Sequence, residues 1–287
     1  MTGLPTRPEG LAPLRRPVLI AAFEGWNDAG DAATSAVEHL VEVWGAEAVC
    51  EVDPDDYYDF QVNRPTVSLV DGAARRITWP TTTVSVCRLP DAAFDLVLLR
   101  GLEPNMRWRG FCAELLEMVQ QLGVVRVVTL GALLADSPHT RPVPVSGTSA
   151  DPETAARLGL EPSRYEGPTG IVGVFQEACE RAGLPALSFW AAVPHYVSQP
   201  PCPKATVALL GRIEDALDVP VPLGDLPEAA RAWERQVDEL AAEDSDVAEY
   251  IATLEEREPE ELPEDSGEAI AKEFERYLRR RDDGPRG

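Results

Sequence analysis

The chain has 287 residues, which is enough to bury a large core as one α/β domain or as one domain with an appendage. Its 49 acidic and 26 basic residues give a net charge of −23, and such a field disfavours binding to nucleic acid or to an anionic membrane surface. The opening segment lacks the apolar region of a signal peptide, and no apolar run has the roughly 18 residues of a membrane span. The five cysteines form no C-x-x-C pair, so the sequence predicts a cytoplasmic protein with reduced thiols.

Apolar runs alternate with amphipathic segments from residue 17 to residue 217. A buried strand is predicted at 17–23 and a helix at 31–44, whose apolar side chains recur at helical spacing. Further strands are predicted at 47–52, 66–70, 75–79, 82–88, 95–100, 124–134 and 186–193, and further helices at 106–122, 168–182 and 203–217. This order indicates helices on both faces of a largely parallel or mixed sheet. The hairpin-like strands at 66–88, with Asp71-Gly72 at a turn, favour the mixed sheet.

The composition changes at Gly224, and we therefore divide the chain into an α/β core at 1–223 and an acidic segment at 224–287. The second part holds 21 acidic and 9 basic residues, so −12 of the net charge lies there. Its apolar residues nevertheless follow steps of three and four, first over 226–254 and again from Ile270. This pattern predicts a helical hairpin broken between Glu258 and Pro263. Its apolar stripe would close on itself, on the core or on another subunit, or the segment is an ordinary hairpin with a solvated acidic face.

The stretch AFEGWNDAGDAA at 22–33 follows the first predicted strand. Asp28 or Asn27 can cap the helix that begins near Ala29, because their side chains accept N–H groups that the first turn leaves unpaired. Glu24 and Trp26 are not explained by a cap. Since they come at the carboxyl end of a strand, where α/β sheets bind ligands, Glu24 could act as a general base or bind a hydroxyl group and Trp26 could stack on a ring. Both interpretations stay open: a turn with a cap, or a ligand or partner contact.

Two further loops carry candidate site residues. His139 and Arg141 follow the strand at 124–134 and could orient an anion, although an exposed proline-rich loop would look the same. Tyr165, Thr169 and Gly170 lie in YEGPTGIVG at 165–173, which opens a helix whose N–H groups could surround an anion. Close helix packing explains the glycines of that stretch equally well.

Common enzyme signatures are missing from the sequence. It contains no G-x-S-x-G, H-E-x-x-H or G-x-x-x-x-G-K-[ST] motif and no cluster of metal ligands, so neither a metal nor a cofactor is expected. Of the other two histidines, His39 lies within a predicted helix and is interpreted as structural. His195 ends a strand, where ligand contact and a satisfied core position are equal alternatives.

Several short motifs together resemble the proteasome assembly chaperone two family. They are EGWNDAG at 24–30 and GPTGI at 167–171, and, as in the longer actinobacterial members, YDF at 58–60, RP at 64–65 and GLEP at 101–104. The resemblance covers about residues 15–220. It implies a three-layer α/β/α domain similar to nucleoside phosphorylases, and a homo-oligomer, with a trimer favoured.

The resemblance also implies a function. Archaeal and eukaryotic relatives act as chaperones that bind proteasome α-subunits, typically through a C-terminal hydrophobic-Tyr-X tail. This sequence instead ends in RRRDDGPRG, and its nearest tyrosine is Tyr277 in a predicted helix. The acidic hairpin is therefore expected to be a different interaction device, with a basic partner.

Two functions from different classes follow. The first is a non-enzymatic binding or assembly protein that acts as an oligomer and binds protein partners such as proteasome subunits. The second is a small-molecule binding protein or enzyme on a phosphorylase-like fold, with a nucleoside-like or phosphorylated ligand. Its site would combine Glu24, Trp26, Asn27, Asp28, His139, Arg141, Tyr165, Thr169 and Gly170. The two differ in whether these side chains converge on one concave pocket.

Overall fold

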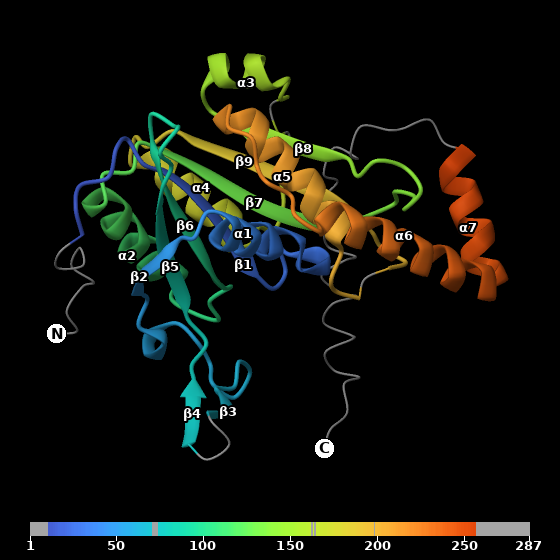
Figure 1. The fold of residues 1–287 in the computed structure, drawn as a ribbon, viewed down its shortest axis with the longest axis horizontal. Helices are drawn as coiled ribbons and strands as arrows, with labels where there is room; N and C mark the ends of the chain where they lie inside the picture. The colour runs from blue at the N-terminus through green and yellow to red at the C-terminus, as the bar shows by residue number, and fades with distance from the viewer. Residues whose placement is uncertain (1–10, 71–73, 162, 164, 198, 257–287) are drawn as a thin grey trace.

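A seven-stranded mixed sheet forms the centre of the molecule (Figure 1). The computed structural model describes residues 11–256 except 71–73, 162, 164 and 198. The strand order is β2-β5-β6-β1-β7-β9-β8. The strands are β1 (Val18–Glu24), β2 (Glu47–Glu51), β5 (Thr82–Arg88), β6 (Asp95–Leu102), β7 (Arg126–Ala135), β8 (Val145–Ser149) and β9 (Ala186–Pro194).

The four central strands, β6, β1, β7 and β9, run parallel, whereas β2, β5 and β8 pair antiparallel at the two sides. The central strands are the uninterrupted apolar runs of the sequence. In β1 every residue from Val18 to Phe23 is buried, which is typical of a strand covered on both faces. The mixed sheet is therefore as predicted.

Helices cover both faces of this sheet and complete three layers. On one face α1 (Ala32–Val43) and α5 (Pro203–Leu217) pack over a core that includes Ile20, Leu40 and Leu209. On the other face α2 (Trp108–Gln121) and α4 (Ile171–Arg181) pack over a core that includes Phe23, Phe111 and Phe175. The three-layer α/β/α class is confirmed, and the likeness to nucleoside phosphorylases stays a prediction.

One strand and one α-helix of the described structure were not predicted. They are the edge strand β8 and the short helix α3 (Pro152–Leu158). The sequence of β8 is VSGTS, which is too short and too polar to give a strand signal. Helix α3 begins with an Asp151 cap and ends at Gly159, but its seven residues contribute a single buried side chain, Leu158.

The strands β3 (Thr66–Val70) and β4 (Ala74–Thr78) form a separate two-stranded antiparallel sheet. Figure 1 shows this hairpin projecting away from the body of the molecule. Nine of its ten residues are exposed, and Val70 is half-buried. The predicted strand positions are confirmed, but these two strands pair only with each other.

The described part of the acidic segment is helical. Helix α6 (Leu226–Glu243) packs its buried Trp233 and Val237 into the core that contains α5, and α7 (Ser245–Glu256) follows. The stripe predicted over 226–254 is therefore interrupted at Asp244, which is extended and whose Oδ1 accepts N–H groups of Asp246 and Val247. Because aspartate caps a helix better than it continues one, the chain restarts there. The predicted break at 258–263 and the stripe from Ile270 lie outside the described residues.

None of the helices in the described ranges is long and apolar enough to cross a membrane. All five cysteines are free thiols, and Cys87, Cys112, Cys179 and Cys202 are buried. Burial raises the pKa of the Cys112 and Cys179 thiols to about 12. These thiols therefore stay protonated at neutral pH, so they are not nucleophiles of the thiolate type.

Candidate functional site

Asp28 caps helix α1 from the end of the β1 loop. Its Oδ1 accepts the backbone N–H groups of Ala33 at 2.7 Å and of Thr34 at 3.3 Å, and its Oδ2 accepts the Thr34 hydroxyl. The predicted cap is thereby confirmed for Asp28. The α-helix begins only at Ala32, because a turn of 3-10 helix (Ala29–Asp31) comes first.

The Asp28 carboxylate lies in a desolvated place. Asp28 is 4% exposed, and burial raises the pKa of its carboxyl group from 3.8 to about 6. The hydrogen bonds from Thr34 and Ala33 lower this pKa, but burial has the larger effect. A raised pKa at a strand end is a property of catalytic acids. Here all three hydrogen bonds go to the first turn of α1, so the carboxylate serves the fold.

Asn27 lies against the start of helix α4. The residue is buried, its backbone carbonyl accepts Ala132 N–H of β7 at 2.8 Å, and its side-chain Oδ1 has no hydrogen-bond partner among the described residues. A Cβ atom placed on Gly170 would lie 1.9 Å from that Oδ1. Gly170 is therefore needed for close approach of the two loops, as one of the two sequence interpretations held.

Glu103 occupies the N-terminus of α4. Its Oε1 accepts Ile171 N–H at 2.9 Å, and the Trp26 backbone N–H also donates to its carboxylate. Burial raises the Glu103 pKa, and these two hydrogen bonds oppose that rise. The chain's own carboxylate therefore occupies the position that one of the two sequence interpretations gave to an external anion. The rest of that stretch is local: the Tyr165 hydroxyl donates to the Pro168 carbonyl at 2.5 Å, and Thr169 is exposed.

His139 and Arg141 lie beneath the C-terminal helices. His139 is 2% exposed; its Nδ1 is 2.8 Å from the Tyr196 hydroxyl and its Nε2 is 3.0 Å from Asp238 Oδ1 of α6. The Arg141 guanidinium donates to the backbone carbonyl of Glu255 in α7. These two side chains thus join the loop after β7 to α6 and α7.

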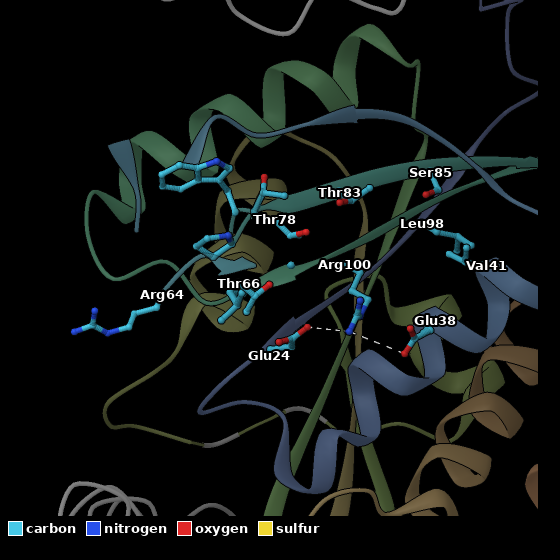
Figure 2. Close-up of a pocket in the computed structure, with 15 residues that line it drawn as sticks. Glu24, Glu38, Val41, Arg64, Thr66, Thr78, Thr83, Ser85, Leu98 and Arg100 are labelled. Atoms are coloured by element: carbon cyan, nitrogen blue, oxygen red, sulfur yellow. Dashed lines mark ion pairs between the residues drawn. The ribbon is translucent and has the colours of Figure 1, made fainter. Parts of the chain in front are cut away.

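Glu24 lies apart from both groups, in a cavity of about 460 Å³ (Figure 2). Arg100 of β6 points between two carboxylates, with its Nη2 at 2.9 Å from Glu24 Oε1 and 4.0 Å from Glu38 Oε2. Burial raises the Glu24 pKa, and Arg100 opposes that rise. The other walls come from β5 and from the stem of the β3–β4 hairpin, where Thr66 and Thr78 face the cavity.

The nine predicted site residues thus fall into separate places. Asp28, Asn27 and Gly170, together with the backbone of Trp26, hold the β1 loop against α1 and α4, while His139 and Arg141 hold the C-terminal helices. Of the nine, Glu24 alone lines the cavity of Figure 2.

Two charged residues of these sites were missed. Arg100 had a signal, as a charged residue at the end of the apolar run at 95–100, whereas Glu103 appeared only within a family motif. Metal chemistry has no support in the described ranges, where no group of three or more His, Cys, Asp or Glu side chains comes together.

A second surface feature is the apolar face of the β3–β4 hairpin. Val67 lies opposite Ile77, and Leu69 shares their face because side chains alternate along a strand. These three side chains are 62%, 58% and 66% exposed in the order Val67, Ile77 and Leu69. Trp79 at the stem is 48% exposed and packs edge-on against Phe60, with ring centroids 4.8 Å apart. An apolar face of this kind is typical of surfaces that bind another surface.

These features define an α/β/α protein whose loop carboxylates cap its own helices and from which a β-hairpin with an apolar face projects, and comparison with known proteins agrees on the fold. The chain belongs to the PAC2 family, whose sequence model matches residues 22–241. It is similar to the crystal structure of a PAC2 family protein from Streptomyces avermitilis, with 64% identity and a TM-score of 0.77 over 82% of this chain and 99% of that chain.

A proteasome-assembly chaperone homologue from Mycobacterium tuberculosis is also similar, with 60% identity and a TM-score of 0.75 over 82% of this chain and 99% of that chain. An archaeal proteasome activator from Pyrococcus furiosus shares the fold at 16% identity, with a TM-score of 0.66 over 80% of this chain and 95% of that chain. No curated protein matches the chain.

Proposed function

We propose that this protein is a non-enzymatic assembly protein that acts in the cytoplasm as a homo-oligomer, with a trimer favoured, and binds proteasome subunits. Family membership and the 60% identity to a proteasome-assembly chaperone homologue support this proposal. In this proposal the protein has two parts, the core at 1–223 and the acidic segment at 224–287, and both serve assembly.

The observation that carries the proposal is the exposed apolar hairpin. Five of the eight large hydrophobic side chains that are exposed in the described residues lie between residues 62 and 79, namely Val62, Val67, Leu69, Ile77 and Trp79. A two-stranded hairpin with no further support is marginally stable in water, so an assembled state that covers this face is favoured.

The polar side chains at the carboxyl edge of the sheet support binding over catalysis. Asp28 and Glu103 are engaged as helix caps, and His139 is engaged between Tyr196 and Asp238. A general acid or base must reach a substrate proton with the same atoms that these groups use internally. Their arrangement holds helices in place, which is what a scaffold for protein contacts requires.

The test is a reconstitution with two separate readouts. The full chain at micromolar concentration is expected to sediment as a trimer and to form a complex with purified actinobacterial proteasome α-subunits in size-exclusion chromatography. An unrelated protein of similar size and negative charge serves as the control for electrostatic binding. Failure to bind either α- or β-subunits would reject the proposed proteasome role. Sedimentation as a monomer would reject the proposed homo-oligomer.

A second candidate function is supported by the cavity beside Arg100. The buried Nε of Arg100 has no acceptor among the described residues, so a ligand oxygen could accept from it. A phosphorylated or nucleoside-like ligand at 100 times its dissociation constant would add ~2.7 kcal/mol to the free energy of unfolding, which a thermal-shift screen detects.

The matched control is at the rim of the same cavity. Arg64 lines it, but its side chain points away from Glu24 and Arg100 (Figure 2). Arg100→Met is expected to abolish the shift and Arg64→Met to preserve it. Absence of a shift with nucleosides, nucleotides and phosphate rejects the second candidate.

A further inference from the structure

The hairpin differs from the rest of the chain in charge as well as in exposure. The chain carries −23, yet residues 62–79 contain three arginines and one aspartate. Arg75 lies opposite Leu69 and therefore shares the apolar face with Val67 and Ile77. Arg75 forms no ion pair with another described residue. The face is thus apolar and basic, and its complement is an apolar and acidic surface.

A surface of that chemistry is present on the same chain, on helix α6. Leu240 is 61% exposed and is the one large hydrophobic residue so exposed in the described parts of α6 and α7. Its neighbours Glu239 and Glu243 are exposed and form no ion pair with a described residue. The helix as a whole has five acidic and two basic residues. Two of its acids are engaged inward, Glu234 with Lys204 and Asp238 with His139.

The two surfaces lie in different parts of one molecule. Figure 1 shows the β3–β4 hairpin projecting below the sheet, whereas α6 and α7 extend beyond another end of the body. Contact between them therefore joins two molecules. Two hairpins packed face to face would instead bring the Arg75 side chains of both copies onto one small interface, where like charges repel.

We propose that the apolar face of the β3–β4 hairpin in one copy of this chain packs against the acidic surface around Leu240 on α6 of the next copy. This inference rests on the oligomeric state in the proposed function. Because the two surfaces differ, the contact is heterologous, and repetition of it closes a ring when the rotation between copies allows. A ring of three is the smallest assembly of this kind beyond a pair, which suits the favoured trimer. Arg75 on the hairpin and the acidic residues Glu239 and Glu243 on α6 carry opposite charges, which sets the direction in which the copies join.

The first experiment compares sedimentation velocity of the full chain and three variants at low micromolar concentration. Replacing Val67, Leu69 and Ile77 together by Ser is expected to yield monomer, with about a 100-fold rise in the Kd for self-association. Leu240→Ser is expected to act in the same direction. Met106→Ser is the matched control, because Met106 is also exposed, at 43%, but lies outside both surfaces. Far-ultraviolet circular dichroism confirms that each variant is folded.

The second experiment tests the heterologous geometry by mixing. In a mixture of the hairpin variant with the Leu240→Ser variant, each pair retains one intact hairpin and one intact helix surface. The mixture is therefore expected to form dimers that neither variant forms alone. Arg75→Glu is expected to weaken self-association, and adding Glu239→Lys and Glu243→Lys to that chain is expected to restore it. Raising the salt concentration should weaken the wild-type contact, because exposed charges are screened.

The outcomes separate this inference from the proposed function. A wild-type oligomer that survives the hairpin or Leu240 substitutions overturns the inference and leaves the oligomer standing. Loss of the oligomer in both variants without dimers in the mixture also overturns the heterologous contact. A wild-type monomer overturns both the inference and the oligomeric part of the proposed function, whereas proteasome binding is measured independently.

Discussion

The loop at the end of β1 and the β3–β4 hairpin invert the usual relation between polarity and exposure. The loop holds Asn27 and Asp28 almost fully buried, while the hairpin holds Leu69 and Ile77 mostly exposed. Buried polar groups need partners, and Asp28 finds them within its own chain in the first turn of α1. The apolar face of the hairpin, in contrast, is left exposed by the described residues. The polar region thus serves the fold, and the apolar region is the surface that the proposed assembly would use. Four substitutions test that contrast.

Asp28→Asn has the largest expected effect, on the pH dependence of stability. Because the Asp28 pKa is raised to about 6, the native state keeps a proton that the unfolded state releases near pH 4. The free energy of unfolding of the wild type therefore falls as the pH rises through this window. A shift of this size corresponds to about 3 kcal/mol at ~1.36 kcal/mol per pKa unit, as an upper bound. The variant lacks this fall. Urea unfolding should therefore show that the free energy of unfolding of the variant, relative to that of the wild type, is higher at pH 7 than at pH 4.

The control for that experiment is Asp53→Asn. Asp53 is an exposed aspartate whose Oδ1 accepts Asp55 N–H at the start of a short helix, so the substitution also removes one charge and alters one cap. Equal pH dependence of wild type and Asp28→Asn would show that the carboxylate is not desolvated, and the loop would then be open to a ligand.

Gly170→Ala tests the contact between the β1 loop and α4. The added Cβ would lie 1.9 Å from Asn27 Oδ1, so the loops must separate at a cost of about 2 kcal/mol in the free energy of unfolding. Combining it with Asn27→Ala should recover part of the loss, since the clashing atoms are gone. The control is Gly211→Ala, because its added methyl group has no atom within 4 Å. Gly183→Ala is less suitable, because Gly183 has a positive φ. Additive effects of the two substitutions would contradict the contact.

His139→Ala tests the attachment of the C-terminal helices. It removes hydrogen bonds to Tyr196 and Asp238 and should lower the free energy of unfolding by about 1.5 kcal/mol. Hydrogen exchange should quicken over 226–256 while β6 stays protected. His39→Ala, which removes one bond to the Pro222 carbonyl, is the control. Faster exchange throughout the chain would indicate a general core defect in place of local release.

Leu69→Ser has the smallest expected effect on the folded chain. Its side chain is 66% exposed, so the free energy of unfolding of the isolated chain should change by no more than about 0.5 kcal/mol. Chemical denaturation at a concentration low enough to keep the chain monomeric measures this directly. A large loss would mean that the hairpin face supports the fold of its own chain.

The periodic parts of the sequence predicted their structure well. The strand expected at 17–23 and the helix expected at 203–217 lie within a residue of β1 and α5, because long apolar runs and stripes define their own faces. Asp28 as a cap was predictable for the same local reason. The pairing of Glu103 with Ile171 and of His139 with Asp238 depends on tertiary approach, which no local pattern encodes.

The candidate site illustrates the same limit. Glu24 and His139 both follow buried parallel strands, so a shared edge was a fair expectation. The structure turns Glu24 toward β6, where it forms an ion pair with Arg100, and His139 toward α6, where it contacts the Asp238 carboxylate. The position of the hairpin in the sequence was clear, but its isolation from the main sheet depends on how β5 pairs with β2 and β6.

The central place of β1 also has a consequence in time. It comes first among the described strands, yet Val18 pairs with Leu96 of β6 on one side and Arg126 of β7 on the other. Until those later strands are synthesised, β1 is an apolar segment without neighbours, and closing such long loops slows folding. Residues 18–24 are therefore an apolar part of the nascent chain that stays unpaired until β6 is synthesised, and exposed apolar segments of this kind are prone to aggregation.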